Sequence, residues 1–176
     1  MLIILDRDGV INTDSPNYVK TPDEWCAIPG SLEAIARLKQ AQHTVCVATN
    51  QSGIARNYYT KETLDAIHQK MQDALAEHGA IIDGIFYCPH HDIDQCDCRK
   101  PKPGLLLQIQ QQFPTPWNET IFIGDSIRDL QAAKAADCPS ILVATGNGRT
   151  TLEQHQPKVP YYPDLAAAVD DILGEA

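Results

Sequence analysis

Two carboxylates, Asp6 and Asp8, stand two positions apart where the first apolar run of the chain ends. A short apolar run such as residues 2–5 is typical of a parallel strand buried on both faces, and ligands of open α/β sheets lie beyond the carboxyl ends of such strands. A carboxylate there can attack phosphorus or hold Mg²⁺, and a second one can protonate a leaving oxygen as a general acid. Asp-x-Asp-Gly is also an ordinary turn sequence, so the pair alone leaves both interpretations open.

Two more apolar runs end in polar residues that suit the same chemistry. Residues 49–53 follow the run 44–48, and residues 124–126 follow the run 120–123. If these strands are parallel, both polar segments open at the same sheet edge as Asp6. Thr49 can donate its hydroxyl to a phosphate oxygen, and Asp125 can join Asp6 on a hard cation such as Mg²⁺. Each segment alone could be a helix cap or a turn, but three such cases in one chain favour an active site.

The composition limits the class of protein. A chain of 176 residues suits one domain, and we expect a single domain over residues 1–176. The net charge of −9 argues against nucleic acid or an anionic membrane as partner. The first apolar run is cut short by charges and no other run approaches the ~18 residues of a membrane span, which predicts a cytoplasmic protein. No feature demands a dimer, so we expect a monomer.

Strand-like and helix-like segments alternate along the chain. Continuous apolar runs predict strands at residues 2–5, 44–48, 85–87, 120–123 and 140–143. Amphipathic segments predict helices that begin near Ser31, Thr60 and Pro103, and two more over residues 127–136 and 165–173. This alternation predicts an α/β fold, a doubly wound parallel sheet with helices on both faces, and residues 157–163 as a surface connection. No segment is long enough for a large cap domain, so short loops must frame the site.

A second motif has the spacing of a metal site. Cys-x-His followed closely by Cys-x-Cys offers three thiolates and an imidazole that suit tetrahedral zinc: Cys88, His90, Cys96 and Cys98. All four positions would be filled by protein, so the Zn²⁺ would be structural. The alternative is a set of scattered loop thiols, which we consider the weaker explanation. The remaining cysteines, Cys26, Cys46 and Cys138, are interpreted as small apolar residues rather than disulfide partners.

Two cations directly follow residues 88–98, the segment that we call the zinc loop. Arg99 and Lys100 come directly after Cys98, so a metal that fixes the loop would present both side chains to an anionic substrate. Lys102 is the alternative phosphate-binding lysine. Because prolines flank it at positions 101 and 103, we expect it to point away, and we favour Lys100.

These motifs resemble those of the haloacid dehalogenase superfamily of phosphohydrolases. The resemblance covers nearly the whole chain through Asp6-x-Asp8, Thr49, Lys100, and Gly124-Asp125 with Asp129 one turn later. It implies the Rossmann-like fold of that superfamily. It further implies that Asp6 is the nucleophile that forms an aspartyl-phosphate, and that Asp8 protonates the leaving alcohol and then activates water. Thr49 and Lys100 would hold the phosphoryl group, while Asp6, the backbone carbonyl of Asp8, and Asp125 would bind Mg²⁺.

Residues 6–12, residues 50–56 and the zinc loop are similar to one group within that superfamily, the bacterial heptose-bisphosphate and histidinol-phosphate phosphatases. This resemblance implies removal of the 7-phosphate of D-glycero-D-manno-heptose 1,7-bisphosphate, on the route to nucleotide-activated heptose for lipopolysaccharide core or a related glycan. The small phosphorylated sugar would contact Asn50, Gln51, Ser52, Arg56, Arg99 and Ser126. The short zinc loop also fits histidinol phosphate as substrate, and a zinc-stabilised phosphosugar-binding protein is the alternative without catalysis.

Three details of the resemblance stay open. Asn57 stands where the group usually has Gly, and Asn tolerates the left-handed backbone that such a turn needs. Ser126 stands where some heptose phosphatases have Lys, so the preferred anomer is undetermined, with Arg128 as a possible replacement cation. Asp14 and Tyr18 are either hydroxyl contacts or plain loop residues, and we favour the second interpretation.

Overall fold

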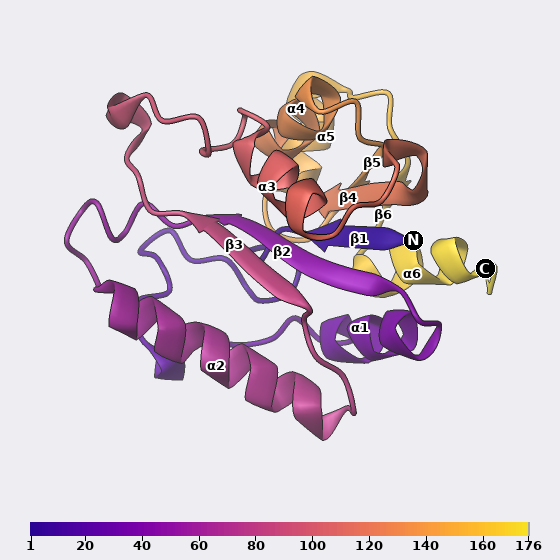
Figure 1. Ribbon diagram of the computed structural model, residues 1–176, viewed down its shortest axis with the longest axis horizontal. Coiled ribbons are helices and arrows are strands. Elements are labelled where there is room, and N and C mark those ends of the chain that lie inside the picture. Colours follow the sequence, from indigo (N-terminus) through magenta and orange to yellow (C-terminus); the bar gives the residue numbers. More distant parts are fainter. Residues whose placement is uncertain (176) are drawn as a thin grey trace.

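A six-stranded parallel sheet forms the centre of the computed structural model, which describes residues 1–175 (Figure 1). Its strands are β1 (Leu2–Leu5), β2 (Thr44–Asn50), β3 (Gly84–Cys88), β4 (Thr120–Gly124), β5 (Ser140–Val143) and β6 (Tyr161–Tyr162). The strand order is β3-β2-β1-β4-β5-β6, and every neighbouring pair is parallel. The chain thus leaves β1 in one direction and returns to its other side at β4, which makes the end of β1 the switch point where ligands bind. The predicted α/β class and doubly wound sheet are confirmed.

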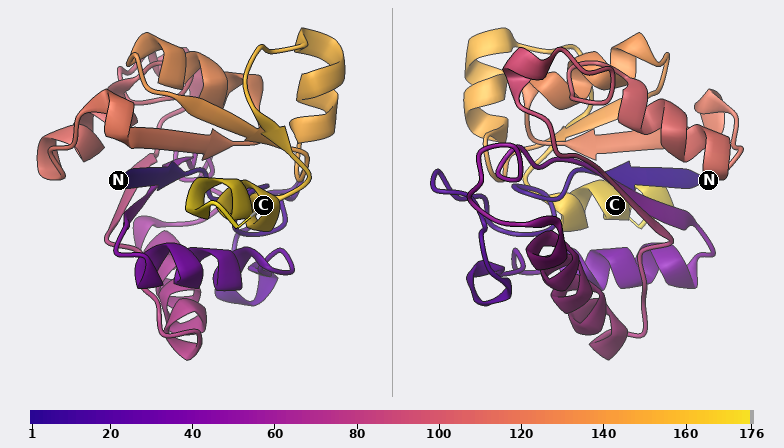
Figure 2. Two further views of the ribbon diagram at one scale, coloured as in Figure 1. Left: turned by 90° about the vertical axis from the view of Figure 1, so that its right-hand side faces the viewer. Right: turned by 60° about the vertical axis from the view of Figure 1, so that its left-hand side comes forward.

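Helices cover both faces of this sheet (Figures 1 and 2). One layer holds α1 (Ser31–Gln40), α2 (Lys61–Glu77) and α6 (Leu165–Leu173), and the other holds α3 (Gly104–Gln112), α4 (Ile127–Ala135) and α5 (Gly148–His155). Alternate side chains of β1 point into opposite layers, so Ile3 and Leu5 join one apolar core while Leu2 and Ile4 join the other. Burial on both faces explains why the strand is apolar at every position.

The structure adds one strand and one α-helix that the sequence pattern did not predict. β6 lies within the expected surface connection at residues 157–163, where Tyr161 pairs with Leu142 of β5. A strand of two residues between prolines is too short to show a periodicity of its own. α5 was also missed, because it buries only Gly148 and Thr151 and therefore has no apolar stripe.

The helix starts differ in detail from the predictions. Thr60 caps α2 as predicted, since its side chain accepts a hydrogen bond from the backbone N–H of Thr63. Ser31 was wrongly predicted as a cap. Gly30 takes that position with a φ of 82°, and the hydroxyl of the buried Ser31 donates to the carbonyl of Ile11 at 2.7 Å. α3 begins one residue after Pro103.

Three other local features can be compared with the sequence. Asn57 has a φ of 58°, so the left-handed turn is preserved as expected. Cys26, Cys46 and Cys138 are free thiols, in agreement with the interpretation that they are not disulfide partners; Cys46 and Cys138 are buried, whereas Cys26 is exposed. Within residues 1–175, no helix combines the length and the apolar character that crossing a bilayer requires.

The cap of α2 leads to a stability prediction. Thr60→Ala removes the acceptor for the Thr63 N–H, so we expect the free energy of unfolding to fall by about 1 kcal/mol. Thr60→Ser keeps the hydroxyl and should stay close to the wild type. Urea unfolding followed by circular dichroism measures both variants, and equal stability of Thr60→Ala and Thr60→Ser would show that the hydroxyl does not act as a cap.

Candidate active site

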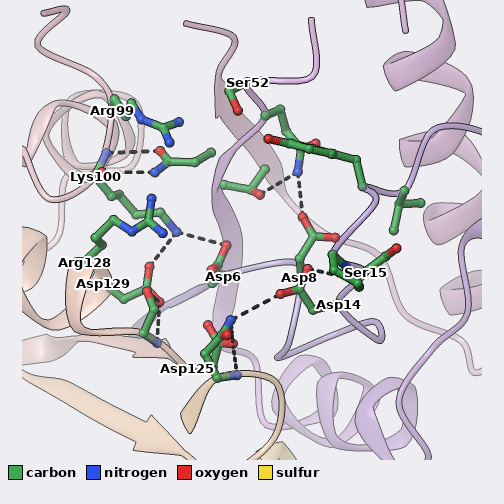
Figure 3. A pocket seen from close by; sticks show the side chains of 18 residues that line it. Asp6, Asp8, Asp14, Ser15, Ser52, Arg99, Lys100, Asp125, Arg128 and Asp129 are labelled. Carbon is green, nitrogen blue, oxygen red and sulfur yellow. Dashed lines mark hydrogen bonds and ion pairs between the residues drawn. The ribbon is translucent and has the colours of Figure 1, made fainter. Parts of the chain in front are cut away.

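A cavity of about 300 Å³ opens at the carboxyl edge of the sheet, above the ends of β1, β2 and β4 (Figure 3). Its walls combine acidic, amide, hydroxyl and basic side chains from loops that are distant in sequence. The lining residues include Asp6, Asp8, Thr49, Asn50, Gln51, Ser52, Arg99, Lys100, Asp125, Ser126 and Arg128. The predicted convergence of the three strand ends is therefore what the fold produces.

Three carboxylates lie together at the floor of the cavity. Asp6 follows β1, Asp125 follows β4, and Asp129 lies in the first turn of α4. All three side chains are buried, and one oxygen from each lies within 4.8 Å of the others. This is the geometry of an oxygen-ligand site for a hard divalent cation.

The ammonium of Lys100 balances part of this negative charge. Its side chain is 2% exposed, and Nζ lies 2.9 Å from Oδ1 of Asp6 and 2.7 Å from Oδ1 of Asp129. Nζ also donates to the carbonyl of Ala48 at 2.8 Å. Burial by itself would lower the pKa of Lys100, but the two carboxylates raise it above its usual range. The charged form of Lys100 is therefore secured.

One ammonium does not neutralise three carboxylates. Burial, followed by the charges of Asp129 and Asp8, raises the pKa of Asp6 to about 7, although Lys100 opposes the shift. Burial, then the neighbouring Asp129 and Asp6, raises the pKa of Asp125 to about 8. Raised values of this kind mark a site with uncompensated negative charge, which a divalent cation would stabilise. The donor set thus fits Mg²⁺.

Asp8 lies on the other side of Asp6 from Lys100 (Figure 3) and its side chain is not part of the carboxylate cluster. Its oxygens accept five hydrogen bonds, from Arg7, Asn12 and Gln51. Burial alone would raise the pKa of Asp8, but Arg7 and these hydrogen bonds lower it. Only the backbone carbonyl of Asp8 was predicted as a Mg²⁺ ligand, and that stays a prediction, whereas Asp129 joins the cluster in addition to the predicted Asp6 and Asp125.

Thr49 is placed to donate to an anion. Its buried hydroxyl accepts a hydrogen bond from Nε2 of Gln51 at 2.9 Å, which leaves the hydroxyl proton free for a phosphate oxygen. The same Gln51 amide donates to Oδ2 of Asp8 at 2.8 Å, and its oxygen accepts from the hydroxyl of Tyr59. Gln51 was predicted as a substrate contact, but its amide group is committed to positioning Thr49 and Asp8.

Asn50 and Ser126 likewise line the cavity while their polar groups hold other residues. The amide of Asn50 exchanges two hydrogen bonds of 3.1 Å with the backbone of Lys100. The hydroxyl and the N–H of Ser126 both donate to Oδ2 of Asp129, which caps α4. Asn50 and Ser126 thus support Lys100 and Asp129, and their contacts with a substrate stay predictions.

Two arginines and a serine complete the cavity wall. Arg99 and Arg128 both line it, as does the hydroxyl residue Ser52. Arg56 was predicted to contact the substrate, but the structure does not bring it there: within residues 1–175 it is absent from the cavity lining, and its guanidinium lies 4.0 Å from the carboxylate of Asp92.

Some lining residues were not found by sequence reasoning. Asp14 and Tyr18, which we favoured as plain loop residues, lie in the cavity wall. Asn147, which precedes the missed helix α5, donates to Oδ2 of Asp125 from its backbone N–H at 2.7 Å and from its side chain at 3.1 Å. The only local signal for Asn147 was the short polar segment after β5.

Gly9 permits the loop after β1 to approach Asp125, which follows β4. It has a φ of 85°, and a Cβ at this position would lie 2.2 Å from Oδ2 of Asp125. A Cβ on Gly146 would lie equally close to Oδ2 of Asp125, and 2.6 Å from Cα of Gly9. Both glycines are therefore required for the space around Asp125 rather than for the turn alone.

The second predicted metal site also assembles. Cys88, His90, Cys96 and Cys98 place their ligand atoms within 4.8 Å of one another, with neighbouring sulfur atoms 3.6 Å apart. Tetrahedral zinc with Zn–S bonds of about 2.3 Å requires sulfur separations of about 3.8 Å. Lys102 points away from the cavity, as expected, and donates to the carbonyls of Gln95 and Cys96 in this loop.

Comparison with known proteins identifies the family. A model described as haloacid dehalogenase-like hydrolase matches residues 5–137. The chain belongs to this hydrolase family. A relative from Pseudomonas aeruginosa is 53% identical over 173 residues, 98% of this chain and 97% of that protein, and one from Bordetella bronchiseptica is 53% identical over 177 residues, 99% of both. Both relatives are named D-glycero-β-D-manno-heptose-1,7-bisphosphate 7-phosphatase.

A solved structure agrees with the fold of this hydrolase. The crystal structure of D,D-heptose 1,7-bisphosphate phosphatase from Bordetella bronchiseptica, complexed with magnesium and phosphate, superimposes with a TM-score of 0.96 at 54% identity and covers 99% of each chain. The fold predicted from the sequence motifs is thereby confirmed.

The carboxylate cluster leads to a stability prediction for the metal-free hydrolase. The pKa of Asp125 is raised from 3.8 to about 8 in the folded protein. Between these two values the folded state keeps a proton that the unfolded state has lost, so the free energy of unfolding falls as pH rises through the interval. In EDTA, Asp125→Asn should therefore unfold at higher urea concentration than the wild type at about pH 8, with a smaller gain at about pH 5. Added Mg²⁺ should stabilise the wild type alone.

The exposed Asp73→Asn of α2 serves as the control, because it makes the same chemical change away from the cluster. A gain in Asp73→Asn equal to that in Asp125→Asn, or a gain that does not depend on pH, would contradict the electrostatic explanation.

Proposed function

We propose that the chain removes the 7-phosphate of D-glycero-β-D-manno-heptose 1,7-bisphosphate in a Mg²⁺-dependent reaction. The observation that carries the proposal is the likeness along the full length to relatives named for this activity, together with a cavity in which the residues needed for phosphoryl transfer converge. The β-anomer is preferred in the proposal because the names of both relatives specify it. The product would enter the synthesis of nucleotide-activated heptose.

Asp6 is the proposed nucleophile. Two groups contact its carboxylate within residues 1–175. The N–H of Arg7 donates to Oδ1, and the ammonium of Lys100 pairs with the same oxygen. Oδ2 is therefore left to attack the phosphorus of the 7-phosphate, and the P–O bond to the sugar breaks as the aspartyl-phosphate forms. Thr49 donates to one phosphoryl oxygen, and Lys100 neutralises another.

Asp8 handles the proton in both halves of the reaction. It gives a proton to the leaving sugar oxygen, and the resulting carboxylate then takes a proton from the water that attacks the aspartyl-phosphate. The hydrogen bonds that lower the pKa of Asp8 favour the carboxylate needed in the second half. The negative charge of the bound phosphate beside Asp8 favours its protonated form in the first half.

The proposed Mg²⁺ would be held by carboxylate oxygens of Asp6 and Asp125, with Asp129 beside them. When bound, Mg²⁺ would supply positive charge against the phosphoryl oxygens. Arg99 and Arg128 at the rim would receive the 1-phosphate, and Ser52 would contact a sugar hydroxyl.

The protein is further predicted to act as a single-domain monomer in the cytoplasm.

The zinc loop is proposed to hold one structural Zn²⁺ through Cys88, His90, Cys96 and Cys98. Burial opposes thiolate formation, but a backbone hydrogen bond from Arg99 and the neighbouring thiols lower the pKa of Cys96 to about 7, which eases metal binding. Because Cys98 precedes Arg99 and Lys100 directly, the metal would also fix both cations at the cavity.

Substrate comparison tests the proposed activity. We expect kcat/KM for phosphate release from the β-anomer to exceed that for the α-anomer or for histidinol phosphate by roughly tenfold or more. Phosphorus NMR should show that the remaining phosphate is the anomeric one. Asp6→Asn is the control. Because an amide cannot attack phosphorus, this variant should release no phosphate, and its circular dichroism spectrum should match that of the wild type. A higher kcat/KM on histidinol phosphate than on the heptose bisphosphate would show that the proposed substrate is wrong. Turnover by Asp6→Asn at the wild-type rate would refute the covalent mechanism.

Elemental analysis tests the zinc proposal. Protein purified without chelators should contain about one Zn²⁺ per chain, and Cys98→Ser should contain much less. EDTA should remove activity in two stages, first a rapid loss that Mg²⁺ restores and then a slow loss that Mg²⁺ alone does not restore. Zinc-free wild-type protein with full activity would exclude a role for the metal.

A further inference from the structure

Arg7 stands between the two proposed catalytic carboxylates in the sequence, yet its side chain is almost fully buried behind Asp8 rather than part of the cavity wall. Its guanidinium is 1% exposed and does not line the cavity, so it cannot contact the substrate. A buried guanidinium requires partners for its charge and its N–H groups, because an unpaired buried cation is strongly unfavourable. Those partners are Asp8 and His68.

The contact with Asp8 has the geometry of a fork. Nε donates to Oδ1 at 3.2 Å, and Nη2 donates to Oδ1 at 2.9 Å and to Oδ2 at 3.1 Å. A planar guanidinium that contacts both oxygens holds the carboxylate in one orientation, which a single flexible cation would not do.

His68 completes the arrangement from a different element. It lies on α2, is 7% exposed, and places Nε2 at 3.2 Å from Nη1 of Arg7. Because guanidinium nitrogens only donate, Nε2 must be the unprotonated nitrogen of a neutral imidazole. Burial, together with the charge of Arg7, lowers the pKa of His68 to about 3, in agreement with this assignment.

From this geometry we infer that Arg7 and His68 are a positioning pair, in which His68 on α2 holds the guanidinium that orients Asp8 for proton transfer. The inference rests on the proposed function, since it assigns a role in the acid–base step of that reaction. His68 acts through the guanidinium of Arg7, and that guanidinium acts through Asp8.

The orientation matters because the two oxygens of Asp8 are not equivalent. Oδ1 accepts three hydrogen bonds, two from Arg7 and one from Asn12, whereas Oδ2 accepts two, from Arg7 and Gln51. Oδ2 thus keeps the greater capacity to carry the transferred proton. Loss of the fork would let the carboxylate rotate and would reduce the fraction of molecules with Oδ2 correctly placed.

Paired substitutions at His68 test the inference while leaving the cavity lining intact. His68→Gln retains an acceptor for Nη1 of Arg7, whereas His68→Leu fills similar space without one. We expect kcat/KM on the heptose bisphosphate to fall roughly tenfold in His68→Leu and to stay within about threefold of wild type in His68→Gln. Arg7→Gln should lose more, about a hundredfold, at the lower end of the ~10²–10⁴-fold that a general acid–base group is typically worth.

The leaving group separates positioning from a general loss of structure. 4-Nitrophenyl phosphate releases an oxygen that needs little protonation, so kcat/KM on this ester should change by less than about threefold in His68→Leu. Equal losses on both esters would overturn the inference.

A double-mutant cycle with Asp8→Asn gives the decisive comparison. If His68 acts through Asp8, adding His68→Leu to Asp8→Asn should lower kcat/KM no further, whereas an independent structural effect would multiply the two losses. Multiplied losses would overturn the inference. The ring nitrogens of His68 give a readout besides activity: their ¹⁵N shifts should show a neutral ring from about pH 5 to about pH 8, changed in Arg7→Gln. A ring that protonates in that interval would also overturn it.

An error in the proposed substrate can be distinguished from an error in the positioning pair. If the wild type hydrolyses another alkyl phosphate instead of the heptose bisphosphate, the proposed substrate is wrong, but the cycle can be measured on that ester. If the wild type hydrolyses the heptose bisphosphate and the cycle is multiplicative, only the positioning pair is wrong. Should His68→Leu not fold, Arg7→Gln and Arg7→Lys provide the same cycle, with Arg7→Lys expected to restore little because a single ammonium cannot fork.

Discussion

The buried ammonium of Lys100 is the interaction on which the site depends. Without it, Asp6 and Asp129 would face each other and Asp125 in a nearly dry environment, at a cost that would favour protonation of the nucleophile. With it, the three carboxylates still carry two uncompensated negative charges when all are ionised, which a divalent cation can balance. The carbonyl of Ala48 and the aromatic face of Phe122 complete the surroundings of Nζ.

Much of the neighbouring structure serves to deliver this one side chain. Asn50, at the end of β2, holds the backbone of Lys100 through both of its amide atoms. The zinc loop begins with the last residue of β3 and ends two residues before Lys100, so a metal-bound loop would anchor the lysine from the other direction. Rigid placement is needed because phosphoryl transfer depends mainly on position and charge.

The sequence predicted the fold and the core of the site because their signals are local. Continuous apolar runs mark buried parallel strands, and the polar residues directly after β1, β2 and β4 must then meet at one edge. The prediction failed where the signal was not local. β6 and α5 have no periodicity of their own. Arg56 was predicted at the cavity from its neighbours in sequence, whereas its guanidinium lies 4.0 Å from the carboxylate of Asp92 and does not line the cavity.

The sequence by itself determined which chemistry is available: Asp6 and Asp8 at the end of one strand, Thr49 and Asp125 at two others, and four zinc-type ligands before Lys100. Only the tertiary structure decided which polar groups face the substrate and which support them. The identity of a residue does not reveal its burial, so Arg7 could as well have been a solvated cation. Packing against α2 buries it, and the cost of an unpaired buried charge then commits its guanidinium to Asp8 and His68.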